Sequence, residues 1–272
     1  MSKIFKSFKA SPKYSIKWSN YFDIYENLFQ KFLKKKIKIV EVGIGDGGSL
    51  FMWKNFFGKN AKIIGIELNP EAKNLQKNGF KIYNGDQSSP DFWKSFYKKT
   101  GKIDILIDDG GHTNLQQITT LVESINFIKP GGMIIIEDTH TSFMKNKGFK
   151  NPSKYSFINF TLSIIEIIHR RNPNLNKKLN FISKKINSIE YYDSITVINI
   201  AKKKLNKSKN LENNKKLRNY FVDYRYKRKN ISKKIEKKNF SNFFSNKISK
   251  RSYLYRIYEN SIIKKYLKLI TN

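Results

Sequence analysis

The sequence predicts an α/β protein with a doubly wound, mainly parallel, Rossmann-like sheet. Three observations favour this fold class. Short runs of almost entirely apolar residues alternate with helical segments between positions 37 and 200. A glycine-rich loop follows the first run, and acidic residues follow the later ones. Strands that are apolar along their whole length are typical of a parallel sheet covered by helices on both faces.

The strands are expected from short apolar runs that end at glycine or at acidic residues. In chain order they are Ile37–Val42, Ala61–Glu67, Lys81–Tyr83, Ile103–Ile107 and Met133–Ile136. Helices are expected between them, over Ser49–Phe57, from Pro70, from Pro90, and over Asn114–Phe127. Asn69 and Ser89 precede these prolines, and a capping residue followed by proline is a helix-start signal.

The pattern weakens after Thr141, where a helix over Tyr155–Arg171 is expected. Two later segments, Asn180–Ile182 and Ser188–Asn199, predict strands that form a late antiparallel hairpin. The segments before and after the sheet are assigned separately. Residues 1–36 are expected to be a helical lead-in, residues 37–201 the sheet domain, and residues 202–272 a basic, helical C-terminal extension.

The charge is unevenly distributed along the chain. The 272 residues have a net charge of +33, and residues 201–272 alone carry 23 Lys and Arg against 4 Asp and Glu. Such an excess suggests an anionic partner, either nucleic acid or a membrane surface. A compositional bias towards Lys, Asn and Ile is the alternative explanation. The stretch Tyr253–Ile270 is compatible with a basic amphipathic helix that lies on an anionic membrane or a lipid-linked glycan.

Composition also excludes several classes of site. The chain has no Cys, so disulfides, Cys-ligated zinc and a thiol nucleophile are excluded. The first eleven residues contain no apolar run of signal-peptide length, and no stretch of about 18 apolar residues is present. A cytoplasmic protein is therefore expected, with peripheral membrane contact through the tail as an option.

The loop after the first strand resembles a nucleotide-binding turn. Gly43, Gly45 and Gly48 match G-x-G-x-x-G between a strand and a helix, a spelling that serves NAD, FAD and S-adenosylmethionine alike. Glu41 precedes a Gly-x-Gly-x-Gly string that ends at Gly47, and an acid at this place can bind near the cofactor's ammonium group. The acids after the later strands are not needed for hydride transfer, which favours S-adenosylmethionine.

Further polar residues at the strand ends are candidates for the same cofactor. Glu67 ends the second strand, where a carboxylate accepts hydrogen bonds from ribose hydroxyls. Asp86 and Gln87 follow the third strand, where an adenine amino group would lie. The cofactor-binding residues are thus predicted to be Glu41, Gly43, Gly45, Gly47, Glu67, Asp86, Gln87 and Asp108.

Three carboxylates are expected to converge at the ends of the fourth and fifth strands. Asp109 follows the fourth strand, and Glu137 and Asp138 follow the fifth. If these strands are neighbours, about 4.8 Å apart, the three acids would repel one another unless a cation joined them. Oxygen ligands favour a hard ion, so Mg²⁺ is expected first, with Mn²⁺ or Ca²⁺ as the alternatives.

His112 lies three residues after Asp109 on a glycine turn and is the predicted general base. An imidazole titrates near neutrality, and a nearby metal makes an acceptor hydroxyl more acidic. His140 is assigned either a supporting role beside the metal or a surface position.

Four strings in order resemble a known group of enzymes. EVGIGDGGSLFMWKNFF, GDQSSPDFW, DILIDDGGH and KPGGMIIIEDTHTS are similar to the metal-dependent sugar O-methyltransferases of macrolide and tetracenomycin biosynthesis, within a group that includes rhamnosyl O-methyltransferases and cephalosporin hydroxylase-like proteins. The resemblance covers residues 37–143. It implies a class I methyltransferase sheet, S-adenosylmethionine held by Gly43, Gly45 and Glu67, and Mg²⁺ held by Asp109, Glu137 and Asp138, with His112 as the base.

The expected function is Mg²⁺-dependent methyl transfer from S-adenosylmethionine to a hydroxyl of a sugar or glycoside. Two alternatives remain at this point. The Lys-rich, aromatic tail would suit a nucleic-acid methyltransferase, although no Asn/Asp-Pro-Pro-aromatic string for base amino groups is present. The other alternative is a hydroxylase-like or non-catalytic relative on the same fold. A small-molecule or glycan acceptor is the expected partner, and a homo-oligomer is possible.

Overall fold

The computed structural model describes residues 2–145, 154–170 and 184–203, together with residue 205 and scattered positions between 211 and 264. The chain divides into two units, residues 1–209 and 210–272. In the second unit, the described positions from 257 to 264 are helical. The strand expected over residues 180–182 and most of the helix expected over residues 253–270 lie outside the described residues.

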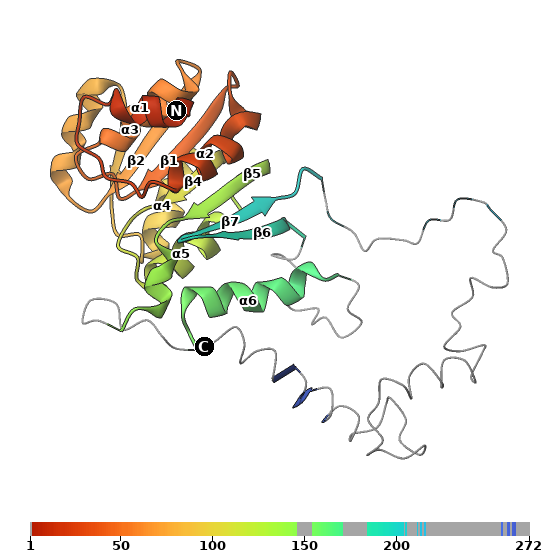
Figure 1. The fold of residues 1–272 in the computed structure, drawn as a ribbon. Coiled ribbons are helices and arrows are strands. Elements are labelled where there is room, and N and C mark those ends of the chain that lie inside the picture. The colour runs from red at the N-terminus through yellow and green to blue at the C-terminus, as the bar shows by residue number, and fades with distance from the viewer. Residues whose placement is uncertain are drawn as a thin grey trace, which may run out of the picture. The chain divides into compact units, whose positions relative to one another are not determined.

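The first unit is built on one seven-stranded sheet with the order β3-β2-β1-β4-β5-β7-β6 (Figure 1). The strands are β1 (Ile37–Val42), β2 (Ala61–Glu67), β3 (Lys81–Asn84), β4 (Ile103–Asp108), β5 (Ile128–Ile136), β6 (Ile186–Tyr192) and β7 (Ile195–Ile200). β1 to β5 pair in parallel, whereas β7 pairs antiparallel with both β5 and β6. The predicted doubly wound sheet with a late antiparallel hairpin is confirmed. The segment Ser188–Asn199 is not one strand, however, because the chain turns back at Asp193 and Ser194, where Ser194 adopts a φ of 65°. Both strands of the hairpin therefore lie within residues 186–200.

Six helices cover the two faces of the sheet. The helices α1 (Lys3–Lys9), α2 (Tyr21–Phe29) and α3 (Gly48–Phe57) share one hydrophobic core with the sheet. The helices α4 (Pro90–Thr100), α5 (Asn114–Ser124) and α6 (Phe157–Ile168) share the other. Three short 3-10 helices, η1 (Gln30–Phe32), η2 (Pro70–Asn78) and η3 (Thr139–Phe143), complete the described elements.

Successive strand residues enter different cores because side chains alternate across a sheet. Ile39 belongs to the core under α1–α3, and Val40 belongs to the core under α4–α6. Each core also contains one fully buried tryptophan, Trp53 in α3 and Trp93 in α4. Because each face is apolar, the strands are apolar along their length, as the sequence pattern indicated.

Several boundaries differ from the expectation. The helix after Asn114 ends at Ser124, because Phe127 leaves it to accept a hydrogen bond from the Ile103 backbone N–H at 3.0 Å. β5 begins at Ile128, and Gly131 adopts a φ of +81° within it. The segment that begins at Pro70 is a 3-10 helix. None of these shifts moves the carboxyl ends of the strands, where the candidate site lies.

The N-terminal lead-in is helical only in part. α1 and α2 are separated by an extended segment, residues 11–20, which we call the strap. The strap hydrogen-bonds to the loop after β1 through Tyr14 and to the β6–β7 turn through Asn20. It therefore crosses the carboxyl ends of the strands. Among the residues that the structure describes, no helix has the length and apolar character needed to cross a membrane.

Candidate active site

The loop between β1 and α3 has a backbone that favours glycine. Gly43, Gly45 and Gly47 have φ angles of +77°, +49° and +88°. Residues other than glycine rarely adopt backbone conformations with positive φ. A Cβ atom at Gly43 would also lie 2.1 Å from the backbone oxygen of Asp109. The close approach of this loop to the end of β4 thus depends on glycine at position 43.

Glu67 holds the glycine loop from the end of β2. One carboxylate oxygen accepts hydrogen bonds from the backbone N–H groups of Ile44 and Gly45, at 3.0 and 3.1 Å. The other accepts hydrogen bonds from Leu68 and Asn69 of its own turn, at 2.9 and 3.1 Å. Glu67 therefore lies at the loop as predicted, and its contact with a ribose stays a prediction.

Glu41 lies inside the protein beneath the same loop. Its side chain is fully buried, and it accepts a hydrogen bond of 2.7 Å from the hydroxyl of Ser49 at the start of α3. Burial raises the pKa of Glu41 to about 7, although the nearby charge of Lys17 lowers it. Glu41 thus supports the loop from below, and its predicted place near the cofactor's ammonium group is untested.

Gln87 and Asp108 brace the loop after β4. The amide of Gln87 donates to the Asp108 carboxylate at 2.9 and 3.0 Å and accepts from the Gly111 N–H at 2.9 Å. Both side chains are buried, and burial raises the pKa of Asp108. The Asp86 carboxylate accepts hydrogen bonds from the backbone N–H and the hydroxyl of Ser88, at 2.8 and 2.7 Å. The predicted cofactor contacts of these three residues stay predictions.

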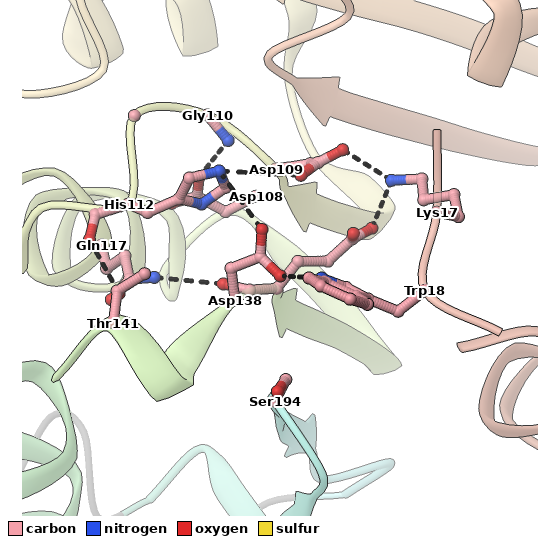
Figure 2. A network of polar contacts seen from close by, with 12 residues as sticks. Lys17, Trp18, Asp108, Asp109, Gly110, His112, Gln117, Asp138, Thr141 and Ser194 are labelled. Carbon is pink, nitrogen blue, oxygen red and sulfur yellow. Dashed lines mark hydrogen bonds and ion pairs between the residues drawn. The ribbon is translucent and has the colours of Figure 1, made fainter. Parts of the chain in front are cut away.

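Asp109, His112 and Asp138 form one cluster, with potential ligand atoms that all lie within 4.8 Å of one another. His112 Nε2 lies 3.4 Å from Asp138 Oδ2 and 3.9 Å from Asp109 Oδ1. Figure 2 shows the imidazole pointing at both carboxylates. β4 and β5 are hydrogen-bonded neighbours, so the strand pairing on which the metal prediction rested is confirmed. His140 lies at the edge of this cluster, with Nδ1 4.0 Å from Asp138 Oδ1.

Two members of the cluster have unusual backbones. His112 and Asp138 adopt φ angles of 56° and 54°, which cost about 1–2 kcal/mol for a residue with a Cβ atom. The Thr141 hydroxyl holds the first by donating to the His112 carbonyl at 3.0 Å. The Tyr21 hydroxyl holds the second by accepting from the Asp138 N–H at 3.2 Å. Strain of this kind persists where the surrounding structure enforces it, and it concentrates at functional sites.

Glu137 is separated from the cluster by Lys17 of the strap. Lys17 Nζ donates to Glu137 Oε1 at 2.7 Å and to Asp109 Oδ2 at 2.6 Å. It approaches Asp109 from the side opposite His112 (Figure 2). Burial alone would lower the pKa of this lysine, but the charges of Asp109 and Glu137 raise it well above the usual value. Lys17 is therefore a buried ammonium that forms ion pairs with two of the three predicted metal ligands.

Other residues before β1 also donate hydrogen bonds to the carboxylates after β5. Tyr21 and Trp18 donate to Asp138 Oδ1 at 2.6 and 3.1 Å, and Tyr25 donates to Glu137. Burial and the hydrogen bond to Asp138 raise the pKa of Tyr21. None of these residues was predicted from the sequence to lie at the site. Tyr21 and Tyr25 are four residues apart on a helix, as core residues often are, so their spacing carries no distinctive signal.

The cluster provides donors that suit a divalent cation. Two aspartates offer the hard oxygens that Mg²⁺ prefers, and Asp138 Oδ2 faces the imidazole rather than a hydrogen-bond donor of α2. Glu137 has a different environment, because its Oε1 accepts hydrogen bonds from both Lys17 and Tyr25. Its role as a third ligand stays a prediction that requires Lys17 to move.

A cavity of about 470 Å³ lies away from this cluster. It opens at the amino ends of β1, β2 and β3, whereas the cluster lies beyond the carboxyl ends. Six lysines line it: Lys38, Lys54, Lys59, Lys62, Lys81 and Lys99. In parallel α/β sheets, ligands bind beyond the carboxyl ends of the strands, so the cluster is the better candidate for the site of chemistry.

Comparison with known proteins gives a consistent assignment. Residues 40–139 match a family described as a methyltransferase domain. The mycinamicin VI 2''-O-methyltransferase of Micromonospora griseorubida is 26% identical over 186 residues, covering 64% of this chain and 46% of that protein. The 8-demethyl-8-alpha-L-rhamnosyl tetracenomycin-C 2'-O-methyltransferase of Streptomyces olivaceus is 30% identical over 138 residues, covering 47% and 36%. The chain thus spans less than half the length of these relatives.

Among solved structures, the fold resembles MycE, a methyltransferase from the mycinamycin biosynthetic pathway. Its complex with Mg, SAH and mycinamycin VI superimposes with a TM-score of 0.64 at 22% identity, covering 74% of this chain and 53% of that one. The region that matches the methyltransferase-domain family, residues 40–139, includes the glycine loop and the cluster at the ends of β4 and β5. Residues 40–139 therefore match a methyltransferase domain, and the chain is similar to sugar O-methyltransferases of macrolide and tetracenomycin biosynthesis.

Proposed function

We propose that the protein transfers a methyl group from S-adenosylmethionine to a hydroxyl of a sugar or glycoside, with a divalent cation, Mg²⁺ first, at the reaction centre. The cluster of Asp109, His112 and Asp138 carries this proposal, because it places a base and two hard-oxygen donors within 4.8 Å of one another. It lies beside the glycine loop, since Gly43 packs against Asp109. A methyl donor in that loop would therefore be close to an acceptor held at the cluster.

Asp109 and Asp138 would hold the cation, and Glu137 would join them if Lys17 moved aside. When bound, such an ion makes a neighbouring hydroxyl more acidic and fixes its orientation. The left-handed backbone at Asp138 turns its carboxylate towards His112. The chain's own hydrogen bonds, from Tyr21 and Trp18, set the position of that carboxylate before any ligand binds.

His112 is assigned the proton transfer. Its Nε2 faces the two aspartates, and a neutral imidazole can accept the proton of a hydroxyl held beside them. The deprotonated oxygen then forms a bond to the methyl carbon. The carbon–sulfur bond breaks with its electron pair left on sulfur, which yields S-adenosylhomocysteine and the methyl ether. Orientation of the two reactants is expected to supply much of the acceleration.

The acceptor class rests on the relatives. One is a mycinamicin VI 2''-O-methyltransferase, and another acts on a rhamnosyl tetracenomycin-C. The matches cover 46% and 36% of the lengths of these relatives. They therefore support a class of acceptor and not a specific one. A sugar hydroxyl is the common feature, and it is the class that we propose.

The substitution Asp109→Asn tests the metal and the methyl donor separately. It removes one cation ligand but keeps the size of the side chain. We expect Mg²⁺-dependent turnover to fall by at least about a hundredfold, whereas calorimetry should show S-adenosylhomocysteine binding within about threefold of wild type. Undiminished turnover in the variant, or full wild-type activity in excess EDTA, would refute the metal role. Absence of S-adenosylhomocysteine binding to the wild type would refute the proposed function itself.

A further inference from the structure

Trp18, the tryptophan of the strap, is exposed to solvent beside the cluster. Side chains alternate along an extended segment, and here Lys17 points inwards with 2% of its side chain exposed. The residues on either side of it, Ile16 and Trp18, are 75% and 60% exposed. An aromatic side chain of this size removes roughly 150–250 Å² of surface from water when it is buried. Its exposure next to a reaction centre therefore suggests that it binds a ligand.

The indole ring is held in place although it is exposed. Its Nε1 donates to Asp138 Oδ1 at 3.1 Å, and its ring centroid lies 6.4 Å from that of His140 in an edge-on arrangement. The strap that carries it is fixed on both sides. The Tyr14 N–H donates to Asp46 at 3.2 Å, and Asn20 donates to the Asp193 carbonyl at 3.1 Å. The ring is therefore set before a ligand arrives, which lowers the entropic cost of binding.

We propose that Trp18 is the platform on which the sugar ring of the methyl acceptor stacks. The inference rests on the proposed function and adds a residue that recognises the acceptor. A pyranose presents a face of C–H groups bordered by hydroxyls, and the face of an indole carries the negative charge that attracts such a surface. Asp138 contacts both Trp18 and His112. A sugar lying on the indole would thus present its hydroxyl rim to the base.

The tryptophan content of the chain allows a direct binding test. The protein has three Trp, and Trp53 and Trp93 are fully buried. Quenching of Trp emission by acrylamide therefore reports mainly on Trp18. The probe is methyl α-L-rhamnopyranoside, added to full-length protein with Mg²⁺ and S-adenosylhomocysteine. Sorbitol, a polyol without a ring face, is the control.

We expect the rhamnoside to lower the acrylamide quenching constant by about twofold or more, as expected when a stacked ligand covers the exposed ring. Sorbitol should leave the constant unchanged, and Trp18→Phe should abolish the quenchable emission. Equal protection by both compounds, or no protection by the rhamnoside, would overturn the assignment. Calorimetry of S-adenosylhomocysteine on the same sample reports on the proposed function independently, because the proposal assigns Trp18 to the acceptor and not to the methyl donor.

Kinetics of three variants separate stacking from support of the strap. Trp18→Ala should raise the KM for the acceptor by about tenfold or more, with the KM for S-adenosylmethionine within about threefold. Any change in kcat should be the same in Trp18→Ala and Trp18→Phe, because both variants lose the hydrogen bond to Asp138. Trp18→Phe keeps a ring and should restore most of the acceptor affinity. Ile16→Ala, an exposed neighbour on the same strap, should leave all constants unchanged. An acceptor KM unaffected in Trp18→Ala, or raised equally in Ile16→Ala, would contradict the proposal.

Discussion

Lys17 brings a positive charge to the place where the acids after β4 and β5 converge. Its ammonium bridges Asp109 and Glu137 and lies 3.7 Å from Glu41. Three carboxylates within reach of one another repel, and a cation is needed to hold them. The chain supplies part of that charge itself, and a divalent ion at Asp109 and Asp138 would supply the rest.

The substitution Lys17→Met should destabilise the protein by about 3–5 kcal/mol, because it leaves the buried carboxylates of Glu41 and Glu137 without their positively charged partner. Mg²⁺ should recover part of the loss, since the ion can take over the freed oxygens of Asp109 and Glu137. Thermal unfolding in Mg²⁺ and in EDTA measures both effects. Lys13→Met is the matched control: the ion pair of Lys13 with Asp46 is exposed, so its loss should cost at most about 1 kcal/mol. Equal costs for the two variants would contradict the role of Lys17.

Glu41 predicts a pH dependence of stability. Burial raises the pKa of its folded form to about 7, above the value of 4.5 expected for the unfolded chain. Between these values the folded state holds a proton that the unfolded state releases, so the contribution of Glu41 to stability decreases as the pH rises through this window. Glu41→Gln, which cannot ionise, lacks the effect.

Urea unfolding of wild type and Glu41→Gln across pH 4.5–8 checks this sign. The free energy of unfolding of wild type relative to the variant should decrease by roughly 3 kcal/mol over that range. Groups other than Glu41 titrate in both proteins and cancel in the difference. A difference that stays constant, or that increases with pH, would show that Glu41 is ionised throughout.

At the scale of the elements, the glycine loop is determined by what it touches. Gly43 and Gly45 both have positive φ angles, but only Gly43 has an atom close to its missing Cβ, the Asp109 carbonyl at 2.1 Å. Gly43→Ala should therefore displace the end of β4 and reduce both S-adenosylhomocysteine affinity and stability. Gly45→Ala meets nothing within 4 Å and should cost only the backbone strain, about 1–2 kcal/mol. Calorimetry and thermal unfolding compare the pair, and equal losses would contradict this account of the loop.

The elements also separate what the sequence could predict from what it could not. Apolar runs that end at glycine or acidic residues predicted the positions of β1 to β5. Their alternation with helices predicted a parallel sheet, so the proximity of Asp109 and Asp138 was predictable. The contacts of Lys17 were not, because its partners lie 92 and 120 residues further along the chain. A lysine in a Lys-rich segment has no local pattern that distinguishes a buried ammonium from a solvated one. The extended strap, which brings Lys17 and Trp18 to the acids, likewise lacks a periodic signal.

The directions in which individual side chains point could also not be predicted from the sequence. Glu137 and Asp138 are adjacent, yet the first is buried against Lys17 and Tyr25 while the second faces His112. Asp138 has a left-handed backbone conformation at the point where the two side chains diverge. The residue types do not predict this conformation. Gln87 and Asp108 illustrate the same point, since their polar groups bind each other.

At the scale of the whole molecule, the match to a methyltransferase domain covers residues 40–139 of the first unit. The family match ends at residue 139, and residues 201–272 carry 23 of the 54 Lys and Arg. Binding of this tail to a membrane surface, to a lipid-linked glycan or to nucleic acid stays a prediction from charge, as do the domain boundary at residue 201 and a homo-oligomer. These questions are separate from the chemistry at the cluster.

The central claim is metal-dependent methyl transfer to a sugar hydroxyl. Its most direct measurement is transfer of label from methyl-labelled S-adenosylmethionine to glycosides, nucleotide sugars and lipid-linked glycans, in Mg²⁺ and in excess EDTA. The account predicts a labelled glycoside ether in Mg²⁺, loss of that product in EDTA, and loss of it in Asp109→Asn. Labelled product that forms equally well in EDTA, or label that enters RNA or DNA but no glycoside, would contradict it.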